Sequence, residues 1–143
     1  MNTDSADQLG LSLDARNPGL LHSDLTGQII EGFYHVYNTL GAGFLEKVYE
    51  SALAVALRKK GLEVEAQFPT SVIFEDVEVG QYFADLVVAR TVIVEVKAAE
   101  AICGAHEAQL LNYLRATRFP VGLLLNFGRK PEFRRKVAAR DSP

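Results

Sequence analysis

Hydrophobic residues recur at helical spacing in the first part of the chain. Between Leu25 and Leu40 they return every three to four positions, and Gly41 follows as a helix stop. Ser23 or Asp24 is placed to cap this helix at its start. A second apolar stripe runs from about Leu45 to Lys60, and it too is followed by a glycine. The pattern predicts two consecutive helices over these ranges.

The middle of the chain changes to the alternation of apolar and polar residues that is typical of strands. Pro69 and Gly80 punctuate this region, so we expect short strands with turns between them. The last two strands are rich in β-branched residues and are joined by a tight turn near Arg90. The expected strands are Val64–Phe68, Ser71–Phe74, Val77–Gln81, Tyr82–Ala89 and Thr91–Val96.

The remaining elements complete an α/β pattern. A third helix is expected from about Ala105 to Thr117. The run from Val121 to Asn126 is almost fully apolar, which predicts a strand buried on both faces. The segment from Pro131 to Ala139 stays open between helix and strand. This order of elements predicts an α/β fold with a mixed central β-sheet flanked by helices.

Length and composition fit one domain. With 143 residues, of which 48% are hydrophobic, the chain can bury a core without disulfides or structural metal. Residues 1–22 are expected to form a disordered leader, and residues 23–143 the domain. Cys103 is the single cysteine, which excludes an internal disulfide and favours a reducing cytoplasm. The sequence shows no signal peptide or spanning run, so no membrane partner is expected.

Charge is distributed unevenly along the chain. The net charge is −3, but the segment from Arg115 to the end carries +6 and the rest carries −9. One interpretation is that this basic tail places positive charge beside an acidic site, where it can hold a phosphate backbone. The other is a solubilising surface. The sequence leaves both interpretations open.

The candidate chemistry lies on Asp85, Glu95 and Lys97. Because side chains alternate along a strand, Glu95 and Lys97 share a face, and a hairpin turning at Arg90 places Asp85 opposite Glu95. Cross-strand carboxylates about 5 Å apart repel each other unless one is protonated or a cation binds. Oxygen-rich sites suit Mg²⁺ or Mn²⁺, which activate water for phosphodiester hydrolysis. The alternative is a solvated face with an ordinary ion pair.

Short motifs in a fixed order extend this picture over residues 25 to 137. Residues 43–49 read Gly-Phe-Leu-Glu-Lys-Val-Tyr, and four more motifs follow: Tyr82-Phe-Ala-Asp85-Leu, Val94-Glu95-Val96-Lys97-Ala, His106-Glu-Ala-Gln109-Leu-Leu-Asn-Tyr113-Leu and Gly122-Leu-Leu-Leu-Asn126-Phe127-Gly128. In these motifs the chain resembles the GxxExxY protein family, which is placed in the PD-(D/E)xK nuclease superfamily. The resemblance implies a restriction-endonuclease-like core.

The resemblance also implies a metal site for Mg²⁺ or Mn²⁺. Glu46 matches the acidic residue on the first core helix, and Asp85 matches the central metal-binding aspartate. Glu95 matches the acid of the (D/E)xK element, and the backbone carbonyl of Val96 is a further ligand. By spacing alone, Glu46 is equally an acid that complements the dipole of its helix.

The implied catalytic set is Asp85, Glu95, Lys97 and Gln109, with Lys97 assisting the attacking water and Gln109 bordering the site. The implied function is a divalent-metal-dependent nuclease that hydrolyses phosphodiester bonds of DNA or RNA. The alternative is a catalytically weak or inactive domain that binds nucleic acid or protein. Whether the chain forms a homodimer stays open.

Neighbouring polar residues have less specific interpretations. Tyr49 shares the apolar stripe of its helix and is expected in the core with its hydroxyl bonded. Glu50 is expected at the surface rather than beside the site. His106, Gln109 and Tyr113 line one face of the third helix, which is free to face the site because leucines occupy the opposite face.

Overall fold

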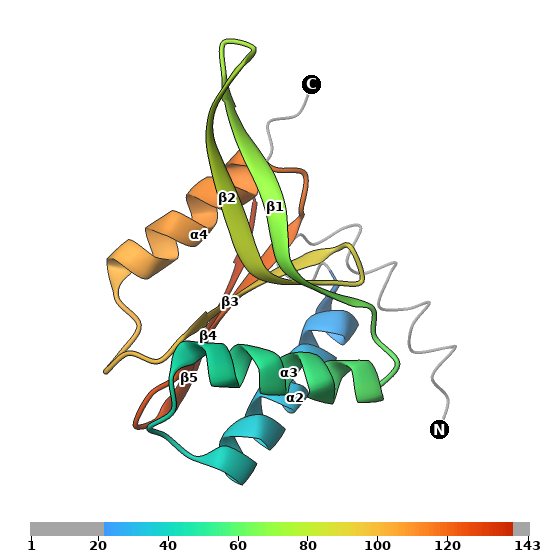
Figure 1. Ribbon diagram of the computed structural model, residues 1–143, viewed down its shortest axis with the longest axis vertical. Coiled ribbons are helices and arrows are strands. Elements are labelled where there is room, and N and C mark those ends of the chain that lie inside the picture. Colours follow the sequence, from blue (N-terminus) through green and yellow to red (C-terminus); the bar gives the residue numbers. More distant parts are fainter. Residues whose placement is uncertain (1–21, 139–143) are drawn as a thin grey trace.

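A five-stranded sheet forms the centre of the molecule, in the strand order β1-β2-β3-β4-β5 (Figure 1). The computed structural model describes residues 22–138, so the expected leader lies, except for residue 22, outside the described residues. Neighbouring strands are antiparallel except β3 and β4, which are parallel and are connected through α4. The predicted mixed α/β sheet is therefore confirmed. The strands are β1 Val64–Phe74, β2 Val77–Val88, β3 Val92–Lys97, β4 Val121–Phe127 and β5 Pro131–Val137.

Helices cover both faces of this sheet (Figure 1). Two of them, α2 (Ser23–Leu40) and α3 (Glu46–Lys59), pack on one face, and α4 (Gly104–Ala116) packs on the other. No helix among residues 22–138 is both long enough and apolar enough to cross a membrane.

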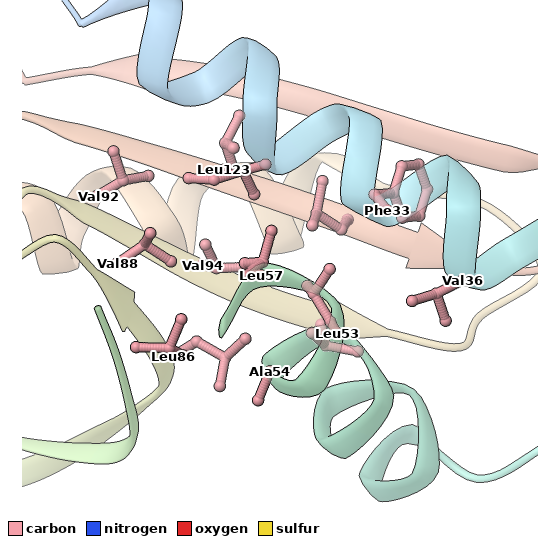
Figure 2. Close-up of a cluster of buried hydrophobic side chains, with 14 of the residues drawn as sticks. Phe33, Val36, Leu53, Ala54, Leu57, Leu86, Val88, Val92, Val94 and Leu123 are labelled. Carbon is pink, nitrogen blue, oxygen red and sulfur yellow. The ribbon is translucent and has the colours of Figure 1, made fainter. Parts of the chain in front are cut away.

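Alternation along β3 divides the core into two layers. Val92, Val94 and Val96 point to the face covered by α2 and α3, where they meet Phe33, Leu53 and Leu57, whereas Ile93 points to α4. Figure 2 shows this first layer, in which Val92 and Val94 belong to one cluster with side chains of both helices. Every residue of β4 is buried, as its apolar run predicted. This alternation is the one from which a common face was predicted for Glu95 and Lys97.

The start of α2 differs from the prediction. His22, in a left-handed conformation (φ 57°), occupies the N-cap position, so Ser23 and Asp24 lie inside the first turn and neither caps the helix. The Thr26 hydroxyl donates back to the carbonyls of His22 and Ser23. At the other end the prediction is confirmed: Gly41 has a positive φ of 71°, and its N–H donates to Tyr37 O.

The four short strands expected between residues 64 and 89 form two long ones. Pro69 lies inside β1 and Gly80 inside β2, so no turn forms at either. The turn expected between Phe74 and Val77 is confirmed at Glu75 and Asp76, which both have positive φ. Pro69 is tolerated because β1 is an edge strand, where a missing N–H need not interrupt a ladder on both sides. The outer part of this hairpin rises above the sheet as a two-stranded arm (Figure 1).

Two further predictions are settled by the backbone. The tight turn near Arg90 is confirmed, with Ala89 and Arg90 both at φ 52°. The segment left open at the end of the chain is strand β5, which pairs with β4 from Pro131 to Val137.

Candidate active site

Asp85 and Glu95 lie where β2 separates from β3. The ladder between these strands pairs Val88 with Val92 and ends at Leu86 and Val94, so the next position outward brings Asp85 to Glu95, as the predicted register requires. The Val96 N–H donates to Asp85 Oδ2 (2.8 Å), and the Asp85 N–H donates to Glu95 Oε2 (3.3 Å). Each carboxylate therefore bonds to the backbone of the opposite strand, in place of the ladder that ends here.

Burial sets the electrostatics of this pair. Only 9% of Glu95 is exposed, and burial together with the nearby Asp85 carboxylate raises the pKa of Glu95 to about 7. The pKa of Asp85 is also raised, chiefly by burial. The Lys97 ammonium acts against both shifts by favouring the ionised forms. Without a further cation, two ionised carboxylates at this place are costly.

A chain of polar contacts connects Glu95 to α4. The Tyr82 hydroxyl donates to Glu95 Oε2, and the pKa of Tyr82 is raised by burial and by the Glu95 charge. The Tyr82 ring stacks on that of Tyr113, with ring centroids 3.3 Å apart and planes 16° apart. Gln109 Nε2 donates to the Tyr113 hydroxyl (3.0 Å). Gln109 is thus linked to Glu95 through two tyrosines. Tyr82 was assigned no role from the sequence, although it lies three residues before Asp85.

Glu46 and Glu50 lie one turn apart on α3, on the side of the sheet opposite α4. Glu46 is exposed at the first turn of the helix, and its Oε2 accepts a long hydrogen bond from the Ala98 N–H (3.4 Å). Glu50 is buried, with 6% exposure, which corrects the expectation of a surface acid. Gln67 on β1 covers it by donating from Nε2 to both carboxylate oxygens (3.2 and 3.0 Å). The negative charge of Glu50 also raises the pKa of Asp85.

His106 takes part in the start of α4. Its Nδ1 accepts a hydrogen bond from the Cys103 N–H (3.3 Å), which satisfies a backbone donor at the helix terminus. Cys103 is an exposed free thiol at the N-cap position of the same helix. The structure thereby gives His106 a capping contact within its own helix.

Asn126 fixes the backbone that follows Lys97. It is fully buried at the position of β4 that pairs with Lys97. Its Nδ2 donates to Ala99 O (3.0 Å), and its Oδ1 accepts from the Ala99 N–H (2.9 Å). A side chain at Gly128 would place its Cβ 2.3 Å from Ala99 O, so a glycine is required there. In the sequence Asn126 appeared as a polar residue ending an apolar strand and as a member of one of the five motifs, with no role assigned to it.

Two pairs of basic residues from the tail have different surroundings. Arg134 and Lys136 on β5 both pair with Glu107 of α4, with N···O distances of 3.7 and 2.6 Å, so their charges are partly neutralised. Arg129 and Lys130 are exposed at the turn between β4 and β5. The interpretation that basic residues of the tail hold a phosphate backbone stays a prediction for this exposed turn.

The donor types at the site suit a hard divalent cation, although the ligands are not preassembled. Within residues 22–138, no three His, Cys, Asp or Glu side chains form a group ready to hold a metal ion. The carboxylates of Asp85, Glu95 and Glu46 instead bond to backbone N–H groups of β2, β3 and the segment after β3. Oxygen donors whose ionised forms are destabilised by burial and mutual repulsion are nevertheless the chemistry that Mg²⁺ or Mn²⁺ favours.

A family model and a solved structure match this chain. The chain is similar to the protein in the crystal structure of SSO0001, at 17% identity and a TM-score of 0.48, over 87% of this chain and 63% of that one. The chain therefore spans less than two thirds of that protein's length. No curated protein gives a significant match. The family model for the PD-(D/E)XK nuclease superfamily matches residues 23–136, and the chain belongs to this superfamily.

Proposed function

We propose that the protein is a divalent-metal-dependent nuclease that hydrolyses phosphodiester bonds of DNA or RNA. One observation carries the proposal: the buried Glu95 carboxylate and the half-buried Asp85 carboxylate lie side by side where β2 separates from β3, and the half-buried Lys97 favours the ionised forms of both. Burying acids of like charge costs free energy that the core does not need. A site that binds a cation and a phosphate accounts for these buried charges, because their free-energy cost then serves the function of the protein.

The roles follow from the contacts. Asp85, Glu95, the Val96 carbonyl and Glu46 would hold Mg²⁺ or Mn²⁺, which polarises phosphate oxygens and lowers the pKa of a bound water. Lys97 lies on the same face as Glu95 and stabilises negative charge that develops at phosphorus. Tyr82 holds the Glu95 carboxylate by its hydroxyl, and Gln109 fixes the Tyr113 ring on which Tyr82 stacks.

We further propose that the chain belongs to the GxxExxY family within the superfamily. Each of the three residues of that motif has its own structural role. Gly43 adopts a φ of 112°, which a side chain would strain. Glu46 reaches the Ala98 N–H beside Lys97. Tyr49 is fully buried, and its hydroxyl donates to Gly41 O (2.5 Å) and accepts from the Phe44 N–H (3.1 Å), which fixes the loop before Glu46.

A second candidate function is a nuclease-like domain that binds nucleic acid or protein without cutting it. The hydrogen bonds that Asp85, Glu95 and Glu46 make to backbone N–H groups favour this candidate, because binding a cation would require these carboxylates to reorient. A cytoplasmic location fits the exposed free thiol of Cys103 under either function. Homodimer formation is compatible with both.

The test compares cleavage of plasmid DNA, single-stranded DNA and RNA in Mg²⁺, Mn²⁺ and EDTA. We expect metal-dependent cleavage that falls at least about 100-fold in Asp85→Asn, which removes a proposed metal ligand, and in Lys97→Ala, which removes positive charge at the reacting phosphate. Asp76→Asn, in the exposed hairpin turn, is the matched control and should retain activity. Cleavage that survives in EDTA, or in both site variants, would contradict the proposed site. Absence of cleavage with retained binding would favour the second candidate.

A further inference from the structure

A cavity of about 440 Å³ lies beside the candidate active site. It is lined by the α2–α3 loop at residues 42–44, by the segment after β3 at residues 98–100, and by the end of β4 with the following turn at residues 127–129. Ala98 connects the two places, because it follows Lys97 in the chain and its N–H donates to Glu46. A ligand in this cavity would therefore lie next to the groups proposed to act on phosphate.

The walls of the cavity are held in place by three side chains. Asn126 clamps both backbone polar groups of Ala99. Tyr49, fully buried, fixes the α2–α3 loop through Gly41 and Phe44. The Tyr37 hydroxyl donates to Arg129 O (2.6 Å) across the turn after β4. Such fixed walls make a preformed binding place, which loses little conformational entropy when a ligand enters.

The lining combines an exposed aromatic ring, Phe44, and a buried one, Phe127, with one cation, one acid and small residues. Phe44 is 47% exposed, and its ring meets Tyr49 in a T-shaped contact with centroids 6.0 Å apart. Arg129 is exposed at the mouth of the cavity, and most of the remaining lining is alanine and glycine. Glu100 contributes a carboxylate, which repels phosphate but accepts hydrogen bonds from an amino group. These groups match the separate parts of a nucleotide.

We propose that this cavity binds an unpaired nucleotide next to the scissile phosphate, with its base against Phe44 and its phosphate at Arg129. The proposal rests on the proposed nuclease function and specifies its substrate class as single-stranded or locally unpaired nucleic acid. In a duplex each base is stacked and paired inside the helix, so a base can enter a cavity of this kind only after leaving the stack. Stacking on an aromatic side chain contributes about 1–3 kcal/mol per base and tolerates any base.

The test measures binding rather than cleavage. Fluorescence anisotropy follows a short labelled single-stranded oligonucleotide, as DNA and as RNA, and the blunt duplex of the same sequence, with Ca²⁺ in place of Mg²⁺ and with EDTA. We expect the wild type to bind a single strand more tightly than the duplex. Phe44→Ala should weaken single-strand binding about 5- to 100-fold, the range expected for one lost base stack. Phe44→Tyr should restore binding, because it keeps an aromatic face.

Val55→Ala is the control, since Val55 is a similarly exposed apolar residue on the outer side of α3 (52%). It should bind as the wild type does. Equal binding by Phe44→Ala and wild type, or duplex bound as tightly as single strand, would overturn the proposed nucleotide site. The two proposals can be contradicted independently. Phe44-dependent binding without cleavage would contradict only the proposed nuclease function. Cleavage with Phe44-independent binding would contradict only the proposed nucleotide site.

Discussion

Glu95 carries the largest electrostatic cost among the proposed site residues. Its carboxylate is buried beside Asp85, and a hydrogen bond from Tyr82 offsets only part of the penalty for ionisation. A carboxyl whose pKa is raised by folding binds its proton more tightly in the folded state. Its contribution to stability is therefore fully present below the pKa of an ordinary glutamic acid, 4.5, and is lost as pH rises through about 7.

The direction of this pKa shift predicts how the stability of the metal-free protein depends on pH. Relative to Glu95→Gln, the wild type should lose free energy of unfolding on the order of 3 kcal/mol between about pH 4.5 and pH 8. Urea unfolding in EDTA at both ends of this range measures the difference. The pKa of Asp85 is raised as well, but Asp85 is present in both proteins, so the difference between them reports on Glu95. Parallel pH dependences in the two proteins would show that Glu95 ionises freely in the fold.

At the scale of elements, the site depends on close packing between α2 and α3, which positions Glu46 and Glu50. The two helices meet where Gly32 on α2 faces Leu57 on α3. A Cβ at Gly32 would lie 2.7 Å from Leu57 Cδ2, and Leu57 is fully buried in the core layer of Figure 2. The glycine therefore sets the distance between the helices, because the Leu57 side chain is fully buried and cannot move away without disturbing the core contacts around it.

A pair of substitutions tests this contact. Gly32→Ala should lower the free energy of unfolding by about 1–3 kcal/mol, since it overpacks a filled core. Gly27→Ala, on the exposed side of the same helix with no atom within 4 Å of the new Cβ, should raise it by about 0.5–1 kcal/mol through helix propensity. Urea unfolding measures both. If the two variants were equally stable, the packing at Gly32 would not limit the approach of the helices.

At the scale of the whole molecule, positive charge is concentrated in the last part of the chain, and the rest of the chain is acidic. The net charge is −3, so attraction to nucleic acid must come from local groups rather than from the total. Arg129 and Lys130 project at the turn beside the cavity, whereas Arg134 and Lys136 are engaged with Glu107. The first pair is therefore available to phosphates, and the second pair is occupied within the fold.

The salt dependence of binding should distinguish these pairs. Changing Arg129 and Lys130 together to alanine should weaken single-strand binding and reduce the slope of log affinity against log salt by about 1.4, or 0.7 for each lost phosphate contact. The double change of Arg134 and Lys136 to alanine alters net charge equally and should leave the slope nearly unchanged. Anisotropy titrations at several salt concentrations give both slopes. Equal slopes for the two double variants would mean that binding responds only to net charge.

The sequence by itself determined the features that depend on local period and turn chemistry. Helical spacing predicted α2, α3 and α4, and alternation about the turn at Arg90 predicted the register that brings Asp85 to Glu95. A fully apolar run predicted the burial of β4. These features need only contacts between neighbours in the chain or across one hairpin, so the pattern of residue types contains them.

Only the tertiary structure decided which polar residues join the site. The buried Glu50 accepts hydrogen bonds from Gln67, which lies 17 residues further along on an edge strand. Tyr82 reaches Glu95 while stacked on Tyr113 of α4, and Asn126 holds a backbone segment that lies 27 residues earlier in the chain. Each of these contacts joins elements whose relative position comes from packing on the two faces of the sheet. No local period encodes that position, which is why the sequence predicted the acids but not the groups that hold them.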